Sequence, residues 1–176
     1  MKKLITLILT VSLVSVMSTA IFATQQSATD SSTQTTQVNA EKKVQRSEFK
    51  AQVTPLRTER KSNREENLAL REQNKLLVTQ LQGKIATIKL SESKLTAEQK
   101  TSLKALRLEV KSIRAEIKAT AGQVKAILEA NKVNLKNMDL AAVQAAFNQV
   151  FGIQDLRHQK LQAINDTLNE MIATLS

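Results

Sequence analysis

An apolar repeat between Leu95 and Ala130 is the feature that most constrains how this chain can fold. Its members recur at alternating steps of three and four residues, which is the spacing of one face of a long amphipathic helix. They are Leu103, Leu106, Val110, Ile113, Ile117, Thr120, Val124 and Ile127. A single helix cannot shield such a stripe from water by itself. The repeat therefore predicts a long helix that packs against other helices.

A row of basic residues follows the apolar repeat at the next position along the chain. Because both rows have the same spacing, they lie side by side on the helix. Such a surface can attract an unfolded protein over a distance and then hold it through apolar contact. We therefore predict a binding surface made of Lys100, Lys104, Arg107, Lys111, Arg114 and Lys118. The alternative is that this row only keeps the helix soluble and pairs with the acidic last third of the chain.

Residues at heptad spacing predict two further long helices. The first repeat contains Leu70, Asn74, Leu77, Leu81, Lys84 and Ile88. The second contains Leu140, Val143, Phe147, Val150, Leu161, Ile164, Leu168, Met171 and Leu175, with Gln154 and Arg157 between its two halves. An asparagine at the position of Asn74 can set helix register and partner number, although a polar residue near a wet helix end explains it equally well.

We expect an all-α fold made of three long helices. They span approximately residues 55–90, 97–130 and 139–175. Pro55 has no backbone N–H, so we expect a short helix to end near Val53 and the first long helix to start at the proline. Short connections at 89–95 and 131–138 make successive helices antiparallel. The predicted architecture is an elongated antiparallel bundle with coiled-coil-like seams, or an open helical hairpin that forms a homodimer.

The composition agrees with thin helical packing. The chain has no tryptophan, no tyrosine and four phenylalanines, so a thick globular core is not expected. It has no cysteine, which excludes disulfide bonds and lipid attachment through cysteine. The formal net charge is +10, and the bases are concentrated in the first two thirds of the chain. This surplus can attract anionic polymers of a cell envelope.

Residues 1–23 have the three parts of a secretory signal peptide, and we place the cleavage after Ala23. The alternative is an uncleaved anchor, but the apolar run is shorter than the roughly 20 residues that span a bilayer. Residues 24–40 are polar and too poor in apolar side chains to fold, so we expect a disordered linker before a helical domain at 41–176. The mature protein is therefore expected outside the cytoplasm, in the periplasm or secreted to the cell envelope.

An LTxxQ element begins the central helix at Leu95, Thr96 and Gln99. Together with the long charged helix that follows, it resembles the motif of Spy, CpxP and related extracytoplasmic helical chaperones. The resemblance implies an exported all-α protein that binds unfolded proteins or a partner protein without ATP. Thr96 and Gln99 also fit a capping box, in which the two side chains exchange hydrogen bonds with the backbone of the first helical turn. A capping box that follows a leucine can have the same letters without any relation to this family.

The sequence contains no recognisable catalytic or metal-binding motif. His158 is the only histidine, and without cysteine it lacks the companions of an ordinary transition-metal site. Because a glycine-rich phosphate loop, a G-x-S-x-G elbow and an H-E-x-x-H motif are all missing, we expect neither an enzyme nor a cofactor. The bases between Arg57 and Arg71 are interrupted by glutamates, so specific DNA binding is not expected.

Our first hypothesis, which follows from the resemblance, is an ATP-independent chaperone or envelope-stress protein. Two other function classes remain open. Long helices alone suffice for a structural coiled-coil protein or a surface interaction protein. Surplus cations alone suffice for a protein that binds anionic polymers, since each neutralised charge releases counterions.

Overall fold

The computed structural model of the chain describes residues 31–91 and 94–175, and every regular element in these ranges is a helix. The predicted all-α class is therefore confirmed. The predicted signal peptide at 1–23 and the first part of the predicted linker lie outside the described residues. Among the described helices, none has an apolar stretch long enough to cross a membrane.

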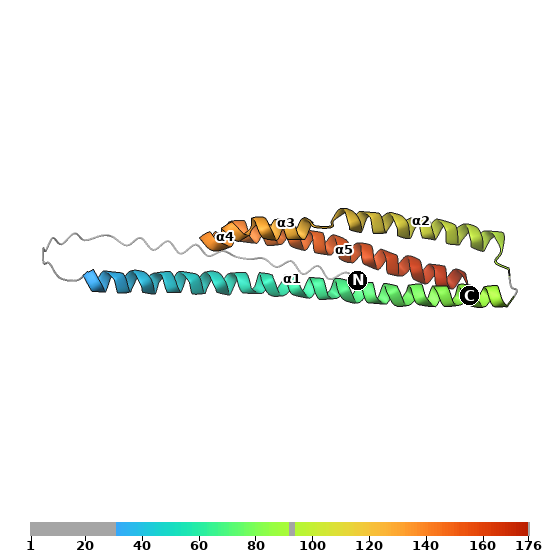
Figure 1. Ribbon diagram of the computed structural model, residues 1–176, viewed down its shortest axis with the longest axis horizontal. Helices are drawn as coiled ribbons and strands as arrows, with labels where there is room; N and C mark the ends of the chain where they lie inside the picture. Colours follow the sequence, from blue (N-terminus) through green and yellow to red (C-terminus); the bar gives the residue numbers. More distant parts are fainter. Residues whose placement is uncertain (1–30, 92–93, 176) are drawn as a thin grey trace, which may run out of the picture.

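Five helices make up the described part of the chain (Figure 1). They are α1 (Ser31–Leu90), α2 (Ala97–Ala119), α3 (Gln123–Ala130), α4 (Lys132–Asn137) and α5 (Leu140–Thr174). α1 runs along the whole molecule, while α2, α3 and α4 form a row that returns in the opposite direction. α5 runs in the same direction as α1 and packs both on α1 and on the returning row. α5 is therefore the element that holds the others together.

A constant register relates α1 to α5. The side-chain amide of Asn67 donates a hydrogen bond to the backbone carbonyl of Gln154 at 3.0 Å, and that of Asn74 donates to the carbonyl of Leu161 at 2.9 Å. In both pairs the two residues are 87 positions apart in the sequence. Equal steps of seven residues keep the same faces of two helices together along their length.

Apolar clusters lie at the two ends of the α1 and α5 pair. The larger cluster joins α1, α2 and α5 and consists of Leu81, Leu103, Leu106, Val110, Ile113, Ile164, Leu168, Met171 and Leu175. The smaller cluster joins α1 and α5 and consists of Val53, Val143 and Phe147. Leu81 and Leu168 follow the asparagine pairs by one heptad on each helix, so the same register continues into the larger cluster. Between the clusters the inner face of α1 is polar, while α5 contributes the buried residues Val150, Gln154 and Leu161.

The apolar faces predicted for the second and third long helices are the faces that the structure buries. On α2 the buried residues are Leu103, Leu106, Val110 and Ile113. On α5 they include Val143, Phe147, Val150, Leu161, Ile164, Leu168 and Met171. Gln154 is buried in the same row, between the two apolar halves. Heptad spacing therefore orients both helices correctly, including the polar position between the halves.

The predicted break at Pro55 is wrong, because α1 continues through the proline. Pro55 is exposed, so the backbone carbonyl that loses its N–H partner can be hydrated by water. On either side of the proline, Val53 and Leu56 pack in the smaller apolar cluster. Packing before and after the proline therefore maintains the helix.

α1 begins at Ser31 and so extends into the segment 24–40, for which the sequence predicts a disordered linker. The helical part of that segment lies beyond α4 and the start of α5 (Figure 1). Extending a helix that already exists needs no new nucleus, because each added residue forms one backbone hydrogen bond. A polar segment can therefore be helical here without burying an apolar face.

The predicted helix at 97–130 is interrupted after Ala119, and the predicted connection at 131–138 contains the short helix α4. Thr120 is buried, and its hydroxyl donates a hydrogen bond to the carbonyl of Ile117 at 2.7 Å. Gly122 follows with a φ of 80°, a left-handed conformation that carries no steric penalty for glycine. The buried polar residue and the glycine together explain why one predicted helix is two.

The capping box predicted at Thr96 and Gln99 is confirmed, and the structure places a second N-cap at Asp139. Thr96 Oγ1 accepts a hydrogen bond from the backbone N–H of Gln99 at 3.1 Å, and Gln99 Oε1 accepts one from the backbone N–H of Thr96 at 3.0 Å. Asp139 Oδ1 accepts from the backbone N–H of Ala142 at 3.0 Å. The Gln99 amide also donates to the carbonyl of Thr174 at 3.0 Å, which joins the start of α2 to the end of α5.

Ile113→Lys should lower the free energy of unfolding by about 3 kcal/mol or more, because it places a charge in the larger apolar cluster. Lys111→Gln lies on the exposed side of α2 and should change that free energy by less than about 0.5 kcal/mol. Thermal unfolding followed by circular dichroism measures both variants. Equal losses in the two variants would contradict the assignment of the buried and exposed faces.

Candidate functional site: a cationic groove on α5

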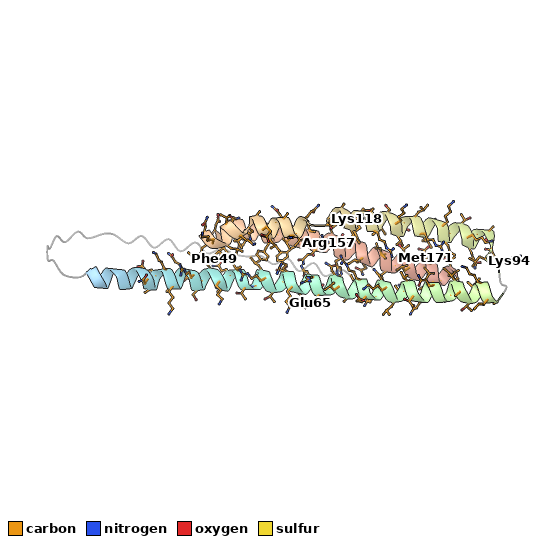
Figure 2. The ribbon with its side chains drawn as sticks, viewed as in Figure 1. Phe49, Glu65, Lys94, Lys118, Arg157 and Met171 are labelled. Carbon is orange, nitrogen blue, oxygen red and sulfur yellow. The ribbon has the colours of Figure 1, made fainter. Side chains whose placement is uncertain are left out.

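A groove runs between α1 and the row of α2 and α3, because both sides pack on α5. Within the described residues, no Cα atom of α1 lies within 8 Å of a Cα atom of α2 or α3. Arg157 and Met171 of α5 lie between the two sides, whereas Glu65 of α1 lies on the outer side (Figure 2). Side chains alone therefore bridge α1 to the returning row and form the groove.

The groove is apolar at its base where α2 faces α1. One section of about 350 Å³ is lined by Leu81, Ile85, Val110, Leu168 and Met171. A neighbouring section of about 480 Å³ is lined by Ile117, Leu161 and Ile164. Val78 and Arg114 line both sections, so the two are continuous. We call this continuous pair the amphipathic section.

Cations line both rims of the amphipathic section. Those from α1 are Arg71 and Lys75, and those from α2 are Arg107, Lys111 and Arg114. In the described part of the chain, no aspartate or glutamate lines this section. Apolar walls exclude water and strengthen the positive potential between the rims. The amphipathic section therefore suits a ligand that carries both acidic and apolar groups.

The structure divides the six predicted binding residues into two sets. Those that line the amphipathic section are Arg107, Lys111 and Arg114. Those that are exposed but do not line it are Lys100, Lys104 and Lys118. The spacing of the row predicts which residues share a side of α2. It contains no information on where α1 faces that side.

The residues of the LTxxQ element have structural contacts at one end of the groove. Leu95 packs against the larger apolar cluster. Thr96 and Gln99 complete the capping box, and Gln99 also bonds to the end of α5. These contacts position the start of α2 beside α5.

A third section of about 530 Å³ continues the groove between α1, α3 and α5, and we call it the cationic section. Arg71 lines both it and the amphipathic section. Its bases are Arg60, Lys61, Arg64, Arg71, Lys125 and Arg157. Glu129 is the one acid in its lining among the described residues, and it forms an ion pair with Lys132. The lining therefore carries a large excess of positive charge.

Arg157 is the partly buried cation of this section. Its guanidinium donates hydrogen bonds to Thr120 Oγ1 at 2.6 Å and to the backbone carbonyl of Thr120. Burial lowers the pKa of Arg157 below its ordinary value, and the positive charge of Arg71 lowers it further. The surrounding protein therefore disfavours the charge of Arg157 instead of neutralising it.

The residues of the cationic section were not predicted as binding residues, although α1 carries a signal for them. Its most shielded positions recur every seven residues at Val53, Arg60, Asn67, Asn74, Leu81 and Ile88. The middle of this column is polar, and a basic residue and two asparagines occupy it. A heptad column that changes from apolar to polar and back can be found in a sequence. To find this column in the sequence, the heptad repeat of α1 must be extended back through Pro55.

Metal binding gains no support from the arrangement of side chains. Within the described residues, no three histidine, cysteine, aspartate or glutamate residues come together as a metal site requires. His158 lines a small pocket of about 210 Å³ with Asn63 and Gln159.

Comparison of the chain with models of known protein families, with curated proteins and with solved structures finds no match. The groove and its charges are therefore the features that point to a function.

Arg71→Glu should raise the melting temperature by about 2 °C, because it replaces a repulsive charge near Arg157 with an attractive one. Lys104→Glu is the control, since it makes the same charge change at an exposed position outside the cationic section. Thermal unfolding at low salt compares the two. An equal rise in both variants would show that only net charge matters, and a fall in Arg71→Glu alone would contradict the repulsion between the two arginines.

Proposed function

We propose that this protein is an exported, ATP-independent helical chaperone or envelope-stress protein that holds unfolded or partner proteins in its groove. The observation that carries this proposal is an apolar base with cations on both rims of the amphipathic section. An unfolded protein exposes apolar and charged side chains along one chain. A surface with apolar and cationic groups can contact both apolar and acidic side chains. It can therefore hold an unfolded chain without recognising a particular sequence.

The occupant of the amphipathic section is a client segment in which acidic and apolar side chains alternate. Acidic groups contact the rim cations, and apolar groups contact residues such as Val110 and Met171. An exposed ion pair contributes about 1 kcal/mol or less, so the client can leave by thermal dissociation. Neither capture nor release then needs ATP.

The sequence adds independent support for this proposal. The apolar N-terminal run favours export to the periplasm or cell envelope. The LTxxQ element at Leu95 resembles the motif of exported helical chaperones. For the architecture we propose an elongated antiparallel bundle with coiled-coil-like seams. The opposite direction of α2 supports the antiparallel arrangement, and the constant separation of the Asn67 and Asn74 pairs supports a coiled-coil-like register between the parallel helices α1 and α5.

A second candidate is a structural or surface interaction protein that binds anionic envelope polymers. The cationic section favours it, because its lining is dominated by bases. A flexible polyanion would use exposed cations along the whole molecule and would not need the apolar base. The two candidates therefore differ in how binding depends on the position of each cation.

Two triple variants on α2 test the chaperone proposal. The groove variant replaces Arg107, Lys111 and Arg114 with glutamine, and the matched control replaces Lys100, Lys104 and Lys118 with glutamine. Both remove three positive charges from one helix, but only the first changes the groove. Light scattering of a denatured, aggregating client at an equimolar ratio measures the effect. We expect the wild type and the control to slow aggregation and the groove variant to lose most of this activity.

Salt provides a second measurement in the same assay. High ionic strength should weaken the wild type, because it screens attraction between exposed charges. A wild type that does not slow aggregation at low salt would reject the chaperone function. Equal losses in the two triple variants would show that net charge matters and not the groove, which would favour the polymer binder.

A further inference from the structure

The cationic section has the properties of a discrete ligand site that is separate from client binding. It lies between α1, α3 and α5, whereas clients are proposed to occupy the amphipathic section between α1 and α2. Five of its cations have no carboxylate partner among the described residues. They are Arg60, Arg64, Arg71, Lys125 and Arg157. Like charges brought together without counter-charges destabilise the empty site and favour a bound anion.

Backbone groups at the start of α3 add to this preference. Gly122 is the N-cap, has no side-chain cap, and lines the cationic section. The backbone N–H groups of Val124 and Lys125, in the first turn, have no hydrogen-bond partner within the described chain, and both residues line the section. Free N–H groups at a helix N-terminus bind phosphate and other anions.

Buried polar atoms at the same place supply a second and independent observation. Arg60 Nε is a buried donor without a partner, and Asn67 Oδ1 and Gln154 Oε1 are buried acceptors without a partner. Asn67 is 7% exposed and Gln154 is 6% exposed, and both lie between the cationic section and the small pocket beside His158, lining each of them. A buried polar atom without a partner is unfavourable, so each of these atoms favours a ligand or water that completes its hydrogen bonds.

The donors and acceptors together define the ligand chemistry. Arg64 and Arg71 offer planar pairs of donors, and Arg60 and Arg157 add their remaining guanidinium donors. Together these match an anion with several oxygen atoms, such as a phosphate group. The two amide oxygens of Asn67 and Gln154 cannot accept from a phosphate diester or dianion, because it has no hydrogen to donate. A ligand that completes their hydrogen bonds directly, in place of water, carries hydroxyl groups beside the phosphate.

We propose that the cationic section binds the phosphate group of a phosphorylated polyol, with Arg60, Arg64 and Arg157 around the phosphate and the amides of Asn67 and Gln154 on its hydroxyls. Glycerol phosphate is the simplest such ligand. It occurs free, within glycerol phosphate polymers and in the headgroup of phosphatidylglycerol, and these sources share the same recognised chemistry.

Isothermal titration calorimetry of the purified protein at low salt tests the site. Its three titrants are glycerol phosphate, inorganic phosphate and glycerol. We expect glycerol phosphate to bind at one site and at least about fivefold more tightly than inorganic phosphate, because only glycerol phosphate carries hydroxyl groups that can donate to the amide oxygens. Glycerol alone should not bind. No binding of glycerol phosphate would overturn the proposal, and equal binding of the two phosphates would overturn its polyol part.

A pair of double variants shows where the ligand binds. Arg64→Gln with Lys125→Gln changes two exposed residues of the cationic section and should weaken glycerol phosphate binding at least about tenfold. Lys104→Gln with Lys118→Gln removes the same charge outside the section and should change it less than about twofold. Equal weakening in both would overturn the discrete site. Circular dichroism of both variants checks that helix content is unchanged.

Vesicles and polymer distinguish the sources of the phosphate. If phosphatidylglycerol vesicles bind the wild type and lose binding with Arg64→Gln and Lys125→Gln, the headgroup is a ligand of this site. The same comparison with a glycerol phosphate polymer tests the polymer. Vesicle binding that survives both changes, without binding of free glycerol phosphate, would overturn the proposal in favour of general surface attraction. If glycerol phosphate does not bind, the light-scattering result of the triple variants is unaffected. The ligand site and the chaperone function are therefore tested separately.

Discussion

The hydrogen bonds from Asn67 and Asn74 to carbonyls of α5 determine how the two longest helices lie against each other. Apolar side chains at heptad spacing can pack nearly as well after a slip of one heptad, because leucine and valine contacts are not directional. An amide that is buried away from its acceptor loses a hydrogen bond, so the asparagines penalise such a slip. The position of α1 along α5 then decides which α1 cations face α2 and α3. The groove therefore depends on two polar contacts in the middle of the pair.

The apolar clusters at the two ends allow this polar middle to exist. The larger cluster holds α1, α2 and α5 together, and the smaller one holds α1 to the start of α5. Between them, Gln154 donates to the carbonyl of Arg60 at 3.0 Å, and Arg157 bonds to Thr120. These bonds satisfy part of the buried polar surface but leave several atoms and charges without partners. Local departures from an apolar core of this kind are expected where a protein binds a ligand.

The sequence predicts the helical class, the buried faces of α2 and α5, and the capping box at Thr96 and Gln99, because spacing and capping are local properties. It does not predict that α1 continues through Pro55, since the packing of Val53 and Leu56 that maintains the helix is tertiary. The interruption after Ala119 was missed for a similar reason, because Thr120 finds its partner in Arg157, far along the chain. Three of the six predicted binding cations line the groove, since spacing along α2 contains no information on where α1 lies.

Arg71 links the two parts of the groove, because it lines both the amphipathic section and the cationic section. An anion near Arg157 would neutralise part of the positive potential that Arg71 contributes to the neighbouring section. A client with acidic side chains would then be attracted less strongly. By reciprocity, a bound client would lower the affinity of the cationic section for its anion by the same factor. Because the link acts through charge at short range, it needs no movement of the helices, and salt would weaken it along with the attraction itself.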